Sequence, residues 1–290
     1  MRMRAQVIQP VALERVARSV EKLGQQPCIL KLTPQQWHCI LVPDAEAGVQ
    51  VWSQLSATAF LSMYRINSAH HDEIYLELRA ENLHRALRSA KGALECIVRL
   101  AKRGQAPVLS FHIVHQSRAG LRQELTQDVP VRVIPPQQME TIREPMVPEP
   151  QVYIMLPQLQ SMRAYAEKMR ALTDHLYIGA NMRGRFSLRC ETDGVEMQTS
   201  WANLINPELD RPSSQSTVAS ASTQPRNLDT LVEARVGIKD LIKFLYSYYV
   251  EPTNVVCCII QDHALVLYVY MGRSSNEQGS LTYYIPVRHA

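Results

Sequence analysis

Residues 73–93 place a strand pattern directly before a helix pattern, and this order restricts the folds open to the chain. Apolar residues alternate with polar ones through 74–78, the period of a strand with one buried face. From residue 81 the apolar positions follow the i, i+3, i+4, i+7 spacing of a helix with one buried stripe: Leu83, Ala86, Leu87 and Ala90. Gly92 follows at a position where helices often end. The stretch therefore predicts a strand followed by an amphipathic helix.

Similar strand and helix patterns recur along the rest of the chain. Further amphipathic helices are expected at 11–23, 158–172 and 238–248. Apolar runs predict strands at 3–7, 28–32, 37–42, 50–55, 74–78, 96–100, 108–114, 128–134, 152–156, 175–181, 185–191, 196–201, 231–236, 255–260, 265–270 and 281–287. Four helices backed by many antiparallel strands indicate an α+β fold.

A proline-rich segment divides the chain into two halves with the same order of elements. Residues 135–150 contain five prolines, which do not fit inside a helix or a central strand. We interpret them as an extended connector between a first domain, 1–134, and a second domain, 151–290. Residues 207–229 are rich in Ser, Thr, Pro and Ala, which predicts a flexible insertion in the second domain.

Cysteine placement and charge exclude several classes of protein. The six cysteines lie in apolar runs and form no CxxC pair, so we expect reduced, buried thiols without a zinc site or a disulfide framework. No apolar run approaches the length of about 18 residues that a membrane-spanning helix needs. The net charge of +4 says little about nucleic acid, so the distribution of charge has to decide.

Basic residues gather on the outer faces of the expected helices. One such helix alone is usually ordinary solvated surface, but four of them can line a common surface with positive charge. Neutralising phosphates requires charge without base-reading geometry, so this pattern favours binding to double-stranded DNA. The candidate DNA-facing residues are Arg15, Arg18, Lys22, His84, Arg85, Arg88, Lys91, Arg163, Lys168, Arg170, Lys239 and Lys243.

Several long blocks of the sequence resemble one known family. They are EIYLELRAENLHRALRSA (73–90), DVPVRVIP (128–135), EPMVPEPQVYIMLPQLQSMRAYAEKM (144–169) and HLYIGANMRGRFSLRCET (175–192). In these blocks the chain resembles the Hus subunit of the 9-1-1 checkpoint clamp, a heterotrimeric relative of the PCNA sliding clamp. The likeness covers nearly the whole chain except the insertion.

The resemblance implies a non-catalytic subunit of a nuclear ring of three different subunits around double-stranded DNA. It implies as partners two other clamp subunits of the Rad family, a clamp loader, and checkpoint and repair proteins that dock beside the connector. It implies no cofactor, metal or small-molecule substrate. The subunit joints would be the edge strands at 128–134 and 194–201, with Asp128, Val129, Val131 and Val133 on one and Val195, Met197 and Thr199 on the other.

Two other interpretations remain open at the level of the sequence. The cluster His70, His71, Asp72 and Glu73 could ligate a metal in a hydrolase, although adjacent residues need further ligands from elsewhere to build a coordination geometry. Alternatively, the chain could be a general two-domain interaction module whose basic helix faces are only solvated surface. Metal titration would test the first alternative, and DNA binding by the assembled complex would test the second.

Overall fold

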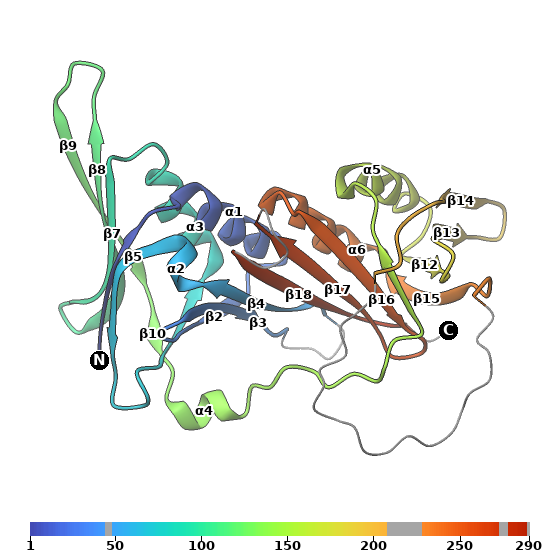
Figure 1. The fold of residues 1–290 in the computed structure, drawn as a ribbon, viewed down its shortest axis with the longest axis horizontal. Coiled ribbons are helices and arrows are strands. Elements are labelled where there is room, and N and C mark those ends of the chain that lie inside the picture. The colour runs from blue at the N-terminus through green and yellow to red at the C-terminus, as the bar shows by residue number, and fades with distance from the viewer. Residues whose placement is uncertain (44–47, 208–227, 273–277, 289–290) are drawn as a thin grey trace. The chain divides into compact units, whose positions relative to one another are not determined.

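The computed structural model describes all residues except 44–47, 208–227, 273–277 and 289–290 (Figure 1). Its contacts divide the chain into two compact units. Unit 1 comprises 1–146, 243–254 and 268–284, and unit 2 comprises 147–242, 255–267 and 285–290. The expected insertion at 207–229 lies almost wholly outside the described residues.

Unit 1 begins with one long run of elements. They are β1 (Arg2–Val7), α1 (Pro10–Glu21), β2 (Pro27–Leu32), β3 (Gln36–Leu41), β4 (Gln50–Ser56), α2 (Ala57–Phe60), β5 (Leu61–Asn67), β6 (Ile74–Arg79), α3 (Ala80–Ser89), β7 (Glu95–Arg103), β8 (Ala106–Gln116), β9 (Arg122–Pro130), β10 (Arg132–Val133) and α4 (Pro136–Glu140). One sheet has the strand order β5-β1-β7-β8-β9. In the other, β10, β6, β2, β3, β4 and the last strand of the chain, β18 (Gly279–Pro286), lie side by side in that order.

Unit 2 starts with β11 (Val152–Met155), α5 (Leu159–Met169), β12 (His175–Ala180), β13 (Phe186–Glu191), β14 (Glu196–Trp201) and β15 (Val232–Gly237). The chain continues with α6 (Ile238–Leu245), the 3₁₀ helix η1 (Tyr246–Val250), β16 (Asn254–Ile260), β17 (Ala264–Met271) and β18 (Gly279–Pro286). Of these, η1 and most of β18 belong to unit 1, most of β16 belongs to unit 2, and α6 and β17 are divided between the units. A four-stranded sheet has the order β14-β13-β12-β15, and β11 pairs with β16. Every strand pairing of this unit is antiparallel among the residues that the structure describes.

Most expected elements are present, and the periodicity gives the buried faces correctly. In α3 the buried residues are Ala80, Leu83, Ala86 and Leu87, and Ala90 directly after the helix is also buried. Pro10 occupies the first turn of α1, where its missing N–H costs no hydrogen bond. All six cysteines are buried and free, as expected.

The structure differs from the expected elements at several places. The predicted strand at 128–134 is two strands, because β9 pairs with β8 whereas β10 pairs with β6. The predicted helix at 238–248 ends at Leu245 and continues as η1. The short helix α2 and the whole strand β5 have no counterpart among the expected elements, because 56–66 has no sustained pattern of either period.

The connector segment is not extended throughout. Pro136 begins α4, where its ring is compatible with the first helical turn. Met139 is 8% exposed and packs in a cluster with Ile40, Tyr75 and Ile134. The helix therefore forms because its apolar residue is buried on the neighbouring sheet, a contact that proline content does not reveal.

Candidate nucleic-acid interface

In unit 1 the helices α1 and α3 lie against each other (Figure 1). Each buries one apolar stripe, which leaves its polar residues on the opposite face. The buried stripe of α1 includes Leu13, Val16 and Val20, and Ser19 lies within 3.0 Å of the hydroxyl of Tyr283 on β18. The helix is thus held by apolar burial and by one buried polar contact. This packing fixes which basic residues of the two helices remain exposed.

His84 belongs to the contact between the two helices and is not a free basic group. Its Nε2 lies 2.7 Å from Glu14 and its Nδ1 lies 2.6 Å from Glu21, both on α1. The side chain is only 14% exposed. Helical spacing assigns His84 to the polar face of α3, and there two carboxylates of α1 cover it.

We expect His84→Ala to lower the free energy of unfolding by about 1–3 kcal/mol, because it leaves Glu14 and Glu21 close together without their shared partner. Urea denaturation measures the change. Arg85→Ala is the matched control, since Arg85 is exposed on the same helix and such substitutions usually change stability by less than about 0.5 kcal/mol. Equal midpoints for the two variants would contradict the bridging role of His84.

Three other DNA-facing candidates in unit 1 already have partners. Arg15 lies 2.6 Å from Glu251, and the guanidinium of Arg18 lies 3.7 Å from the ring centroid of Tyr249 in η1. Arg85 pairs with Glu81 one turn earlier on α3. Exposed ion pairs of this kind stabilise a protein by less than about 1 kcal/mol, so a strong anion can compete for these cations.

Lys22, Arg88 and Lys91 are the exposed basic residues of α1 and α3 whose side chains have no partner among the described residues. Lys22 and Arg88 lie at the carboxyl-terminal ends of their helices, and Lys91 follows α3 by two residues. Positive charge is stabilised there by the helix dipole. On α1, α3 and the residues directly after them, these three side chains are therefore the cations most available to phosphates.

The candidates beyond residue 150 show the same mixture of paired and exposed groups. Arg163 and Arg170 both approach Glu167, at 3.6 and 3.3 Å, and Lys239 lies 3.3 Å from Asp174. Lys168 is exposed and lies 5.6 Å from the ring centroid of Tyr165. Lys243 is half-buried. Glu167 thus pairs with two of the three basic candidates on α5 and directly after it.

Each of the two segments expected at the subunit joints contains the edge strand of a sheet. β9 is the edge of the five-stranded sheet, and β14 is the edge of the four-stranded sheet. Val129 is fully buried and Val131 is 9% exposed, so these two side chains belong to the core of unit 1, whereas Val133 on β10 is half-buried. The carboxylate of Asp128 accepts a hydrogen bond from Arg103 at 2.5 Å, which lowers its pKa.

The exposed part of the first edge begins earlier than the sequence pattern suggests. β9 starts at Arg122, and Leu125 is 44% exposed on it. In Figure 1 the hairpin of β8 and β9 extends away from the helices of unit 1. On the second edge Val195 is 50% exposed, while Met197 and Thr199 are half-buried. Unpaired edge strands with exposed apolar residues are ready to pair with another chain.

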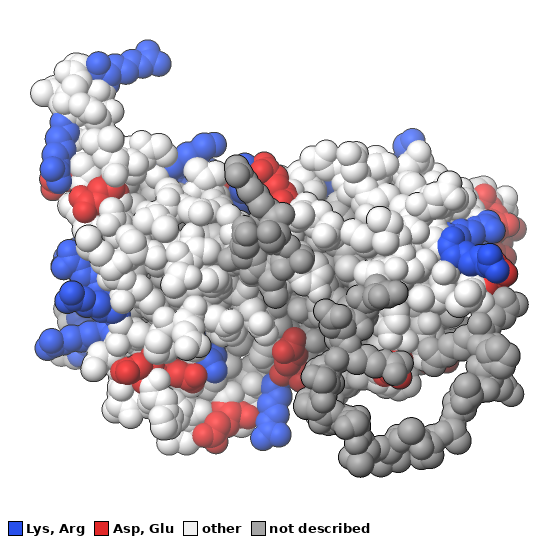
Figure 2. Space-filling view, viewed as in Figure 1, with Lys and Arg blue, Asp and Glu red and all other residues white. Residues whose placement is uncertain are grey.

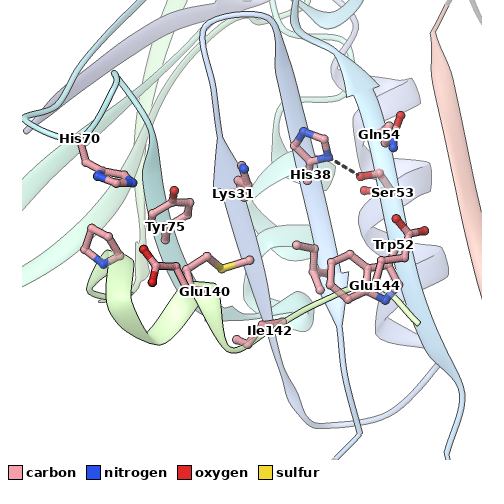
Figure 3. Close-up of a pocket in the computed structure, with 13 residues that line it drawn as sticks. Lys31, His38, Trp52, Ser53, Gln54, His70, Tyr75, Glu140, Ile142 and Glu144 are labelled. Carbon is pink, nitrogen blue, oxygen red and sulfur yellow. Dashed lines mark hydrogen bonds between the residues drawn. The ribbon is translucent and has the colours of Figure 1, made fainter. Parts of the chain in front are cut away.

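A pocket of 330 Å³ lies beside the connector in unit 1 (Figure 3). Its apolar lining includes Ile40, Trp52, Met139 and Ile142. The indole N–H of Trp52 is buried without a hydrogen-bond acceptor among the described residues. Because protein atoms cover this donor, the pocket offers a ligand its apolar side chains and not the indole N–H.

The rim of this pocket carries titratable groups. Glu144 accepts a hydrogen bond from the hydroxyl of Tyr284 at 2.9 Å. Burial raises the pKa of Tyr284, and the negative charge of Glu144 raises it further. Burial, assisted by the charge of Lys31, lowers the pKa of His38 from its usual 6.5. The Nδ1 of His38 lies 3.1 Å from the carbonyl oxygen of Ser53 (Figure 3).

The lowered pKa of His38 predicts a specific loss of stability in mild acid. The unfolded chain binds a proton at a pKa near 6.5 while the folded chain resists it, so stability falls as pH drops through that value. We expect the difference in unfolding free energy between wild type and His38→Gln to change by at most about 1.4 kcal/mol per pH unit. Denaturant midpoints between neutral pH and mild acid test this, and parallel profiles would contradict it.

The possible metal site at 70–73 finds no support in the structure. His70 and His71 stack edge to face, and Asp72 accepts a hydrogen bond from the backbone N–H of Ser68. Glu73 pairs with Lys31 at 3.3 Å. In the part of the chain that the structure describes, no three His, Cys, Asp or Glu residues are placed to hold a metal ion. Among the same residues, no helix is long and apolar enough to cross a membrane.

Comparison with known proteins gives a consistent result over the whole chain. The family model of the Hus1-like proteins matches residues 1–289. The chain is 35% identical over 286 residues to the checkpoint protein hus1 of Schizosaccharomyces pombe, covering 98% of each chain. It is 33% identical over 293 residues to the checkpoint protein HUS1 of Homo sapiens, covering 99% of each.

Solved structures of PCNA share the fold. That of Entamoeba histolytica has a TM-score of 0.71 at 13% identity, with 99% of both chains covered. That of Thermococcus kodakaraensis has a TM-score of 0.70 at 15% identity, with 99% of this chain and all of the other covered. The chain therefore has a PCNA-like fold and belongs to the Hus1-like protein family.

Proposed function

We propose that this chain is one of three different subunits of a ring that encircles double-stranded DNA in the nucleus. As a Hus1-like protein with a PCNA-like fold, the chain is a non-catalytic subunit of a DNA damage checkpoint clamp. The other two subunits would be clamp proteins of the Rad family, and a clamp loader would place the ring on DNA. Residues 1–134 and 151–290 would be the two clamp domains, with 135–150 as their connector.

The observation that carries this proposal is the combination of exposed cations on helices with open edges on sheets. Lys22, Arg88, Lys91 and Lys168 are exposed and contact no carboxylate in the described parts of the chain, so they can approach phosphates without breaking an ion pair. His84 is left out of the DNA-facing set because Glu14 and Glu21 enclose it. The remaining candidates from the sequence stay in the set as secondary contacts.

The edges of β9 and β14 would form the joints with two different neighbours. Strand pairing across a joint satisfies the free N–H and C=O groups of both edges. We expect the isolated chain to be monomeric and to form a closed ring only with two other clamp subunits. Light scattering and native mass spectrometry of the purified chain and of the complex test this, and a stable homotrimer of this chain alone would contradict it.

The pocket beside the connector would be the place where checkpoint and repair proteins dock. Its apolar wall fits a peptide that inserts an apolar side chain. We expect Ile142→Ser to weaken capture of such proteins by the assembled ring about tenfold. Ile142 lines the pocket and belongs to neither edge strand, so ring assembly should not change. Unchanged capture would rule out this pocket.

A further inference from the structure

Three arginines stand in one cross-strand row on the five-stranded sheet of unit 1. Arg4 on β1 lies directly opposite Arg65 on β5 and directly opposite Arg99 on β7. All three side chains are exposed. Figure 2 shows basic side chains gathered along the edge of the view where these strands lie. We call Arg4, Arg65 and Arg99 the arginine row.

The arginine row is unfavourable for the free protein. Like charges on directly opposed residues of neighbouring strands repel each other. On the next two strands, Ser110 lies opposite Arg99, and Asp128 lies opposite Ser110. The carboxylate of Asp128 accepts a hydrogen bond from Arg103, so Arg99 acts on it only through longer-range charge. None of the three arginines pairs with a carboxylate among the described residues. The charge is therefore available to an acidic partner.

A β-bulge next to the row exposes an apolar side chain. The register of β1 and β5 shifts between Arg4 and Gln6, so that one additional residue of β5 has to be accommodated. Met63 at this bulge has φ of +50°, a left-handed conformation that residues other than glycine rarely adopt. Its side chain is 80% exposed. The backbone strain is thus associated with an apolar group that does not contribute to the core.

The bulge and the row share one hollow. A depression of 460 Å³ is lined by Arg4, Met63, Arg65 and Ile97 together with Ala5, Gln6 and Glu95. Glu95 is the one acidic residue in this lining, against two arginines. Carboxylates suit the cations, and the apolar groups suit an aliphatic or aromatic side chain. Nucleic acid is the weaker match, because phosphates gain nothing from Met63 and Ile97.

We propose that this face of β5, β1 and β7 binds an acidic segment of a partner protein. Carboxylates of the segment pair with the arginine row, and one apolar side chain of the segment sits in the hollow against Met63 and Ile97. The surface is distinct from the helices proposed to face DNA and from the pocket beside the connector. It provides the clamp subunit with a second docking site selected by negative charge.

The experiment measures binding of a labelled twelve-residue peptide of Asp and Glu with one central Leu, by fluorescence anisotropy on the full chain. Arg65→Gln combined with Arg99→Gln is expected to weaken binding about tenfold, because two exposed ion pairs are lost. Arg118→Gln combined with Arg185→Gln removes the same charge elsewhere and should change binding less than about twofold. Met63→Gly should weaken it about threefold while relieving the backbone strain, so its melting temperature should not fall.

Two further binding measurements test whether the arginine row and the hollow are specific for an acidic peptide with an apolar side chain. A peptide with Ser in place of the Leu should bind the wild-type chain more weakly than the parent peptide, and duplex DNA should bind the wild type and the row variant equally. Equal weakening by the row variant and by its charge-matched control would overturn the proposal. So would a loss of DNA binding with unchanged peptide binding, since the row would then serve nucleic acid.

Discussion

Replacing Lys22, Arg88 and Lys91 together with glutamate is expected to weaken binding of the assembled ring to duplex DNA more than tenfold. Each phosphate contact contributes about 0.9 to the slope of log affinity against log salt, so losing these contacts should flatten the slope by about 2–3. All three side chains are exposed and have no described ionic partner, so the variant should fold. Acidic charges at the carboxyl-terminal ends of α1 and α3 should lower the free energy of unfolding by about 1–3 kcal/mol. Anisotropy titrations over a range of salt concentrations measure both quantities.

The control for this variant reverses three exposed arginines outside the helices: Arg118, Arg143 and Arg185. It has the same net charge, so it reports the effect of overall charge alone. We expect its salt slope to stay close to that of the wild type. Equal slopes for all three proteins would remove α1 and α3 from the DNA-binding surface, and their basic faces would then be ordinary solvated surface.

Adding a lysine to either joint edge is expected to prevent ring formation. Leu125→Lys on β9 and Val195→Lys beside β14 each place a charge where an exposed apolar side chain would meet a neighbouring subunit. Each should reduce the fraction of complete heterotrimer at least about tenfold, because a charge buried at a joint lacks a partner. Both positions are exposed in the single chain, so its own stability should change by less than about 0.5 kcal/mol.

The two edges should fail in different ways. If each edge meets a different subunit, Leu125→Lys and Val195→Lys should each leave one pairwise complex intact and abolish the other. Ile205→Lys is the matched control, since Ile205 is 64% exposed and lies outside both edge strands. Size-exclusion chromatography of pairwise mixtures separates these cases. Loss of the same pairwise complex in both variants would contradict the assignment of two separate joints.

The sequence was sufficient for the features that depend on local period. Alternation predicts β6 and the helical spacing predicts α3 with the correct buried residues, because each element buries one face on a sheet. The pattern fails at β5, where the bulge at Met63 interrupts alternation. It also misses α4, whose single turn depends on packing of Met139 with residues far away in the chain.

The candidate site could be predicted only in part, because ionic pairing is a long-range property. Periodicity places Arg15 and His84 on polar helix faces, but their partners lie 236 and 70 residues away in sequence. Nothing in the helix patterns indicates that Glu251 pairs with Arg15 or that Glu14 covers His84. Likewise, Val129 appears as an edge residue in the sequence, whereas its side chain is fully buried.

The central claim is that the chain works as part of a closed ring around DNA, with retention supplied by topology. The most direct test loads the complete heterotrimer onto closed circular DNA, washes it with high salt, and measures the bound clamp before and after the circle is cut once. Salt weakens phosphate contacts but does not open a ring. We expect the clamp to remain on closed circles and to leave after cutting. Equal retention on circular and cut DNA would contradict encirclement, as would complete release from both.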